Sequence, residues 1–175
     1  MKDIYSLALH SSCTLFIDNT FDRSEYFITT ISYKNTKIFR KSNKKIPIFH
    51  GLFLLHTSSK TEVFQQFFQH LKNLLSSVAD VKGDSDAWKS NLFFVTDQEK
   101  AITSAIDKVF SNSQRILCSR HINENIKFKL ESKVLKNIFK KLMECKTYDS
   151  FLEIRDSIVT NTNYINSHDK VKGYV

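Results

Sequence analysis

The chain has 175 residues, of which 41% are hydrophobic and 13% are aromatic. This length suits one domain, or one domain with an extension, and the apolar content excludes a disordered chain. Only three glycines and one proline are present, which excludes glycine-rich phosphate-binding loops and proline-rich linkers. The formal net charge of +8 favours polyanionic partners such as nucleic acid, although a basic protein without such a partner would carry the same charge.

The three cysteines, Cys13, Cys118 and Cys145, are few and lie far apart in the sequence. This spacing argues against a disulfide framework and favours a reducing compartment. No apolar run approaches the ~20 residues that a membrane-spanning helix needs. The N-terminus also lacks the charged and then apolar layout of a secretory signal. We therefore expect a soluble intracellular chain with no membrane partner.

The first third of the chain has the pattern of three strands joined by short links. Apolar and β-branched residues predict strands over 14–21, 26–33 and 46–56. Pro47 is expected at the start of the third strand, because proline lacks a backbone hydrogen-bond donor. The polar and basic segment between the second and third strands is expected to form a loop. Such short connections favour an antiparallel meander.

Helical periodicity then alternates with short strands. Residues 63–78 carry apolar side chains on one face of a helix. An apolar run over 91–96 predicts a buried strand, and it is followed by an amphipathic helix over 101–110 and a short strand over 115–118. A strand–helix–strand unit implies a parallel pair with a right-handed crossover. The meander and this unit together predict an α/β fold, in which helices cover a mixed sheet.

From Ile122 onward the sequence is mainly helical. Apolar residues at helical spacing predict one long helix; they are Ile126, Leu130, Val134, Ile138 and Leu142. A shorter helix is expected over 148–160. The polar tail after Thr160 is expected to be poorly ordered.

Two acidic residues lie at the ends of predicted strands. Asp18 is near the end of the first strand, on the face of Phe16 and Thr20 by the period of two. Asp97 directly follows the fourth strand. Open α/β sheets bind ligands at the carboxyl ends of their strands, and two carboxylates with open positions for water and phosphate suit Mg²⁺. If the two strands are neighbours, we expect the carboxyl groups to lie about 4–6 Å apart.

Both acids also have purely structural interpretations. The sequence Thr96-Asp97-Gln98-Glu99 fits a capping box, in which Thr96 is the N-cap and Glu99 is the third helical residue. An acid in the first turn is also favoured by the helix dipole. Asp18 could equally be a strand-end residue in a turn. Capping and metal binding do not exclude each other.

Three stretches, in the right order, resemble the MULE (Mutator-like element) transposase domain of the RNase H-like DDE superfamily. Residues 16–21 (FIDNTF) resemble the family's strand with the first catalytic Asp and a Thr two residues later. Residues 94–101 (FVTDQEKA) resemble its second-Asp motif, with a matching helix behind it. Residues 117–122 (LCSRHI) are similar to its C-x-x-H signature. The resemblance covers roughly residues 14–129.

The resemblance implies a DDE active site on an RNase H-like mixed sheet. Asp18 and Asp97 would be two of its three catalytic, metal-binding carboxylates, with Mg²⁺ or Mn²⁺ as the cofactor. The implied reaction is metal-dependent cleavage and transfer of DNA strands. DNA is the implied partner and the nucleus the implied location, a homo-oligomer is a further possibility, and no small-molecule cofactor is expected.

The third acid of this family lies downstream, beyond a mostly helical insertion. The resemblance therefore divides the chain into a truncated core over 1–122, the start of the insertion over 123–160 and a polar tail over 161–175. On this interpretation the chain is a fragment, a truncated gene product or a decayed copy. The alternative is a catalytically inactive, transposase-derived domain that binds DNA or protein.

Cys118 and His121 belong to the family signature, but the sequence does not reveal their task. Structural zinc sites need four protein ligands, and few further cysteines are available, so a zinc site is disfavoured. Cys118 fits better as a small buried residue at a strand end. His121 could form a hydrogen bond near the acids or contact DNA.

Basic residues cluster in two segments. The loop after the second strand carries Lys34, Lys37, Arg40, Lys41, Lys44 and Lys45. The predicted long helix carries Lys127, Lys129, Lys133, Lys136, Lys140 and Lys141. Either cluster could contact phosphates or be a solvated face, and lysine is common on solvated helices. Phe39, beside Arg40, could stack on a base or pack against the protein.

Overall fold

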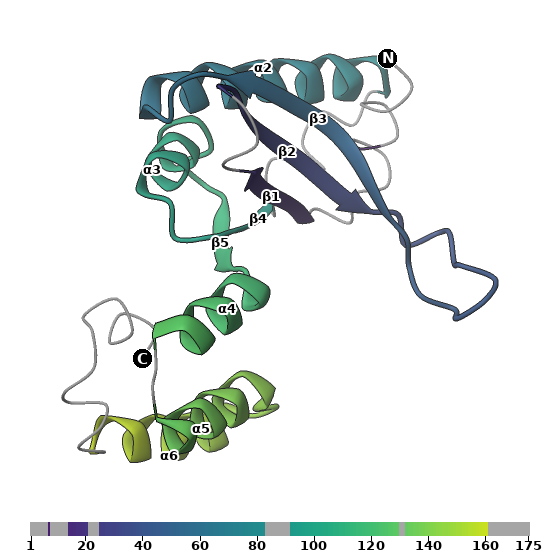
Figure 1. Cartoon of the computed structure of the whole chain (residues 1–175). Helices are drawn as coiled ribbons and strands as arrows, with labels where there is room; N and C mark the ends of the chain where they lie inside the picture. Colours follow the sequence, from purple (N-terminus) through teal and green to yellow (C-terminus); the bar gives the residue numbers. More distant parts are fainter. Residues whose placement is uncertain (1–6, 8–13, 21–24, 83–91, 130–131, 161–175) are drawn as a thin grey trace. The chain divides into compact units, whose positions relative to one another are not determined.

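The computed structural model describes residue 7 and residues 14–20, 25–82, 92–129 and 132–160 (Figure 1). The predicted polar tail lies outside these residues. The chain divides into two compact units, residues 1–117 and residues 118–175. No helix in the described part of the chain is long and apolar enough to cross a membrane.

A five-stranded mixed sheet forms the centre of the first unit. Strands β1 (Thr14–Thr20), β2 (Phe27–Lys34) and β3 (Ile48–His56) form the predicted antiparallel meander. Strands β4 (Phe93–Thr96) and β5 (Gln114–Leu117) are parallel to each other, and β4 is parallel to β1. The order across the sheet is β3-β2-β1-β4-β5. The prediction of an α/β fold with a meander and a parallel unit is confirmed.

Two helices pack together and bury one face of the sheet (Figure 1). Helix α2 (Thr61–Lys82) follows β3, and α3 (Lys100–Val109) connects β4 to β5. Aromatic rings join the layers: the ring of Phe94 in β4 lies 6.0 Å from that of Phe68 and 5.1 Å from that of Phe110. The core of this unit is therefore the layer between these helices and the inner face of the sheet.

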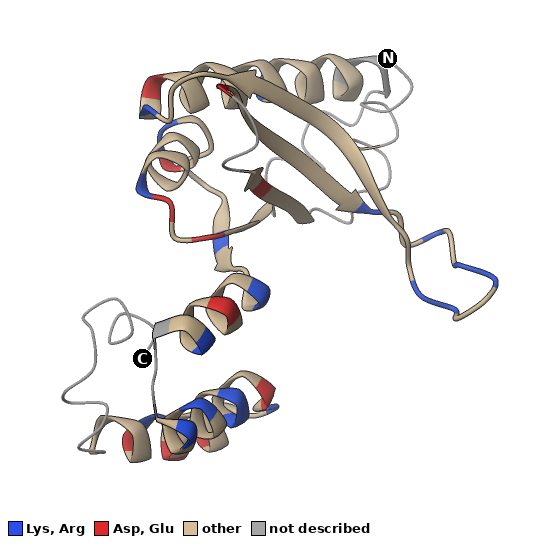
Figure 2. Cartoon of the chain, viewed as in Figure 1, with Lys and Arg blue, Asp and Glu red and all other residues tan. Residues whose placement is uncertain are grey.

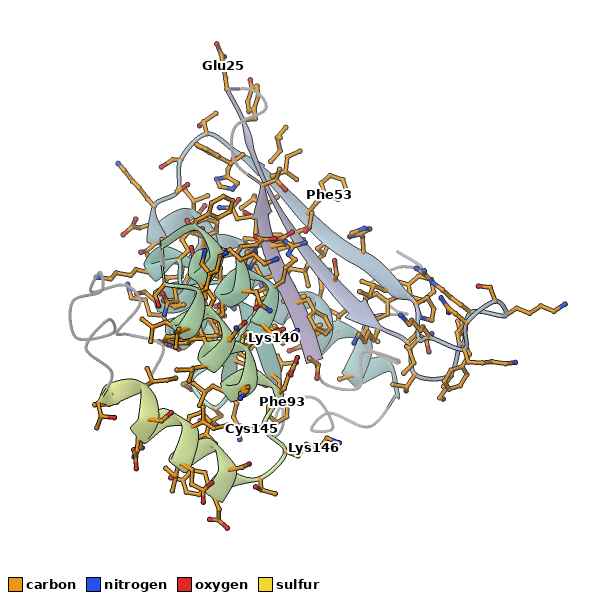
Figure 3. All side chains as sticks on the ribbon, turned by 60° about the horizontal axis from the view of Figure 1, so that its bottom comes forward. Glu25, Phe53, Phe93, Lys140, Cys145 and Lys146 are labelled. Atoms are coloured by element: carbon orange, nitrogen blue, oxygen red, sulfur yellow. The ribbon has the colours of Figure 1, made fainter. Side chains whose placement is uncertain are left out.

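Burial alternates along β1, as expected for a strand with one face on the core. Leu15, Ile17 and Asn19 are buried on the inner face, whereas Phe16 and Asp18 on the outer face are half-buried. The outer face also carries several exposed apolar side chains; they are Ile28, Ile48, Phe53, Leu55 and Ile116. Phe53 in particular is 74% exposed and projects from β3 (Figure 3).

The described residues of the second unit form three helices, α4 (Ser119–Lys129), α5 (Lys133–Glu144) and α6 (Tyr148–Val159). They share a small core; its buried members are Ile126, Leu135, Phe139, Leu142 and Ile158. The prediction of one long helix from Ile126 to Leu142 was wrong. A new helix begins at Lys133, because the Ser132 hydroxyl accepts a hydrogen bond from Leu135 N at 3.4 Å and caps it. The predicted last helix is confirmed as α6.

Candidate active site at the ends of strands β1 and β4

The two predicted site acids follow neighbouring parallel strands. In the register of β1 and β4, Phe16 pairs with Val95. Continuing this register by two residues sets Asp18 level with Asp97, which directly follows β4. Both side chains are half-buried. The prediction that the first and fourth strands are neighbours is confirmed, and the separation of about 4–6 Å between the carboxyl groups stays a prediction.

The side chain of Asp97 shapes the turn between β4 and α3. Its Oδ1 accepts a hydrogen bond from Glu99 N at 3.1 Å, as in an Asx-turn. Helix α3 begins at Lys100, with Glu99 as its N-cap residue and with no side-chain cap. The predicted capping box was therefore wrong: Thr96 is the last, fully buried residue of β4, and the side chain of Asp97 turns the chain before the helix begins.

Glu99 also contacts the neighbouring strand. Its Oε2 accepts a hydrogen bond from Asn19 Nδ2 at 3.0 Å, although the two residues are 80 positions apart. Burial raises the pKa of the Glu99 carboxyl above its ordinary value, and the negative charge of Asp97 acts in the same direction. The hydrogen bond from Asn19 and the electrostatic influence of His56 oppose this rise in pKa.

Asn19 belongs to a chain of hydrogen bonds that crosses three strands. Its Oδ1 accepts from the Thr29 hydroxyl at 3.0 Å, and that hydroxyl lies 2.9 Å from His56 Nε2. His56 Nδ1 lies 2.8 Å from the Ser58 carbonyl oxygen and donates to it, since a carbonyl can only accept. Because the Thr29 hydroxyl has one hydrogen and donates it to Asn19, it can only accept at its contact with His56 Nε2. We call Asn19, Thr29, His56 and Glu99 the Asn19 network.

Sequence analysis did not identify the Asn19 network, because its members come from four separate segments. One signal was available: the period of two places Asn19 on the same face of β1 as Leu15 and Ile17. A polar residue on a core face needs buried hydrogen-bond partners. Which partners these are depends on the pairing of β1 with β2, in which Asn19 lies opposite Thr29.

Cys118 and His121 lie in the second unit, whereas Asp18 and Asp97 lie in the first. Cys118 is half-buried and directly precedes α4, and its carbonyl oxygen accepts from Ile122 N at 3.0 Å. His121 Nε2 lies 3.3 Å from an Nη atom of Arg120. Among the residues that the structure describes, no group of three or more His, Cys, Asp or Glu side chains is arranged to hold a metal ion.

The loop between β2 and β3, residues 35–45, is here called the basic loop. Arg40 N donates to Lys45 O and Lys44 N donates to Arg40 O, both at 2.9 Å, and Lys44 has a positive φ of 56°. The loop extends from the sheet, and its residues include several basic ones and no acid (Figures 1 and 2). Its exposed basic residues are Lys37, Arg40, Lys41, Lys44 and Lys45. Phe39 is 57% exposed and does not pack in a core.

The basic loop and the two acids lie at opposite ends of β1. Asp18 pairs with Thr30 near the carboxyl end of β1, whereas Leu15 pairs with Tyr33 near its amino end. The loop begins just beyond Tyr33, after Lys34. We therefore expect the basic loop and the acids to contact different phosphate groups.

Comparison with known proteins gives one family. A family model described as the MULE transposase domain matches residues 14–125, which is more than half of the chain. The matched range contains all five described strands, helices α2 and α3 and the first part of α4. No curated protein matches the chain.

Proposed function

Because this chain belongs to the MULE transposase domain family, we propose that it is the core of a DNA transposase in which Asp18 and Asp97 hold a divalent metal ion. The family is part of the RNase H-like DDE superfamily. The observation that carries the proposal is the parallel pairing of β1 with β4, whose register leads both acids to the same edge of the sheet. We also propose a nuclear location, which is where a eukaryotic cell holds most of its DNA.

The chemistry of the two acids fits Mg²⁺ or Mn²⁺. Mg²⁺ is usually bound by one or two carboxylates, and water and substrate phosphate supply the remaining oxygen ligands. Asp97 uses Oδ1 in its turn, and its Oδ2 has no hydrogen bond within the described part of the chain. When bound, such an ion activates a water or hydroxyl and neutralises charge on the phosphate. The family also implies a third acid, which we do not assign.

Metal binding by the two acids can be tested by calorimetry with Mn²⁺. We expect the wild-type chain to bind Mn²⁺ and both Asp18→Asn and Asp97→Asn to lose this binding. Asp107→Asn is the matched control, since Asp107 is an exposed acid of α3 in the same unit. Equal heats of Mn²⁺ binding for wild type and Asp18→Asn would show that Asp18 and Asp97 do not share a metal ion.

The basic loop is proposed as a contact to DNA away from the cleavage point. Asp18 and the start of β1 at Thr14 are four residues apart, which corresponds to about 13 Å along the strand. That length corresponds to about four base pairs of duplex DNA. The loop would therefore contact DNA that flanks the phosphate at the acids, and exposed Phe39 is available to stack on an unpaired base.

The salt dependence of DNA binding tests whether the basic loop or the lysines of α5 contact the DNA. The loop variant Lys37→Ala/Lys41→Ala/Lys45→Ala is expected to weaken DNA binding and to reduce the slope of log K against log salt by about 2–3. The control variant, with the same charge change, is Lys133→Ala/Lys136→Ala/Lys140→Ala in α5. A loss of slope in the α5 variant alone would move the DNA contact from the loop to the second unit.

The second candidate function is an inactive, transposase-derived domain that binds DNA. The distance between the basic loop and the acids favours it, since the loop could bind DNA without any chemistry at Asp18 or Asp97. Strand cleavage or transfer by the chain with Mn²⁺ would remove this alternative. Salt-dependent DNA binding that is identical in wild type and Asp97→Asn, with no Mn²⁺ binding, would favour it.

A further inference from the structure

We propose that Asn19 and Glu99 are positioning residues. The hydrogen bond between the side chains of Asn19 and Glu99 fixes the distance between Asp18 and Asp97. Thr29 and His56 hold Asn19 in the orientation that this bond requires. The inference rests on the proposed function, because it assigns the two acids to one metal ion.

The backbone ladder between β1 and β4 ends before it reaches the acids. Its last pair is Phe16 with Val95, two residues before each acid. Beyond this pair, the hydrogen bond of 3.0 Å from Asn19 Nδ2 to Glu99 Oε2 connects the two segments. Asn19 directly follows Asp18, and Glu99 N donates to Asp97 Oδ1. The bond therefore joins the residue next to Asp18 to the residue two positions after Asp97.

The amide of Asn19 is held at both ends. Its Nδ2 donates to Glu99, and its Oδ1 accepts from Thr29, which is fully buried. Thr29 in turn contacts His56, whose ring is packed 5.2 Å from the ring of Phe64 in α2 and is held by the Ser58 carbonyl. In such a buried environment hydrogen bonds are strong, and a chain of them restricts the orientation of each member.

The position of the Asn19 network favours a role in the site over a role in stability alone. An apolar residue at position 19 would continue the core face of Leu15 and Ile17 without a desolvation cost. The polar residue lies instead at the level where the two acids emerge. Because Mg²⁺ tolerates little departure from octahedral geometry, loosening the two segments should weaken metal binding even where the fold persists.

The test measures Mn²⁺ affinity in variants that leave the net charge unchanged. We expect Asn19→Ala to weaken Mn²⁺ binding about 10-fold or more, as is typical for residues that orient metal ligands. Thr29→Val, which keeps the shape and removes the hydroxyl, should weaken binding as well. Thr29→Ser, which keeps the hydroxyl, should retain the wild-type affinity.

Two controls separate positioning from a general loss of stability. Asn73→Ala removes an exposed hydrogen bond to Gln69 in α2 and should leave Mn²⁺ affinity unchanged. Ile31→Val loosens the buried inner face without touching a polar group, so it should lower the thermal unfolding midpoint without changing Mn²⁺ affinity. If Asn19→Ala does not fold, the Mn²⁺ affinities of Thr29→Val and Thr29→Ser decide whether the Asn19 network positions the two acids.

Wild-type affinity in both Asn19→Ala and Thr29→Val would overturn the positioning role. If Asp18→Asn and Asp97→Asn lose Mn²⁺ in the same experiment, the proposed function stands and only this inference falls. If those two variants bind Mn²⁺ like the wild type, the shared metal site fails and the positioning role fails with it.

Discussion

The two faces of β1 have different tasks, although they alternate along seven residues. On the inner face, Leu15 and Ile17 are buried under α2 and α3 and contribute to stability. On the outer face, Phe16 and Asp18 remain half-buried, and apolar neighbours such as Phe53 are exposed. The comparison teaches that substitutions on the inner face should change the free energy of unfolding, whereas Asp18 on the outer face should affect metal binding. Asn19 is the exception, since it lies on the inner face next to Asp18.

The largest expected effect is on the inner face. Phe94→Ala removes a fully buried ring that packs against Phe68 and Phe110. We expect the free energy of unfolding to fall by about 3–5 kcal/mol, because the substitution removes apolar burial and leaves a cavity. Urea unfolding measures this loss. A decrease below about 1 kcal/mol would show that the inner face is not the core.

A smaller loss is expected in the polar part of the inner face. Thr29→Val removes a buried hydroxyl that contacts both Asn19 and His56. We expect a loss of about 1–3 kcal/mol in the free energy of unfolding, since both partners are left without this contact. Urea unfolding of Thr29→Val and Thr29→Ser separates the hydroxyl from the shape. Equal stability of Thr29→Val and wild type would mean that the network contributes nothing to the fold.

The third prediction concerns pH. Burial raises the pKa of Glu99 above 4.5, so the folded state favours the protonated carboxyl. Protonated Glu99 therefore stabilises the fold fully below about pH 4.5, and this stabilisation is lost as pH rises through the raised pKa. Glu99→Gln keeps an oxygen that can accept from Asn19 and carries no charge. Without metal, Glu99→Gln should be more stable than wild type at pH values above the raised pKa of Glu99. The difference in the free energy of unfolding between the two proteins should disappear below about pH 4.5. Urea unfolding over a pH series, with exposed Glu62→Gln as control, measures the effect, and a pH-independent difference would contradict it.

The smallest effect is expected on the outer face. Phe53 is 74% exposed, so Phe53→Ala should change the free energy of unfolding by no more than about 0.5 kcal/mol. Phe53→Ala and Phe94→Ala are the same substitution on opposite faces of the sheet, so their free energies of unfolding compare the two faces directly. A loss in Phe53→Ala as large as that in Phe94→Ala would mean that the outer face is covered in solution.

The sequence predicted the strands well, because alternation along a half-buried strand is a local signal. The order of the strands is not local, and the alignment of Asp18 with Asp97 at one edge of the sheet depended on β4 pairing with β1 rather than with another strand. The prediction from a local motif was wrong where another side chain formed the hydrogen bonds that the motif requires. Thr96 to Glu99 matched a capping box, but the side chain of Asp97 forms a turn and Glu99 bonds to Asn19.

The error in the second unit has a similar cause. The apolar stripe continued through the break between α4 and α5, so periodicity alone predicted one helix. Ser132 interrupts it by capping α5, and the buried positions then become Leu135, Phe139 and Leu142. The period of two could place Asn19 on the core face of β1, but it could not identify the partners of Asn19, because the register of three strands decides which polar side chains meet.

The most direct test of the account asks whether one metal ion contacts both acids. Fe²⁺ can replace Mg²⁺ at oxygen ligands, and with ascorbate and peroxide it produces radicals that cleave the backbone close to the bound ion. We predict cuts near residue 18 and near residue 97 in the wild-type chain, and the loss of both cuts in Asp18→Asn and in Asp97→Asn. Excess Mg²⁺ should suppress both. A cut near residue 97 that persists in Asp18→Asn would contradict a shared ion.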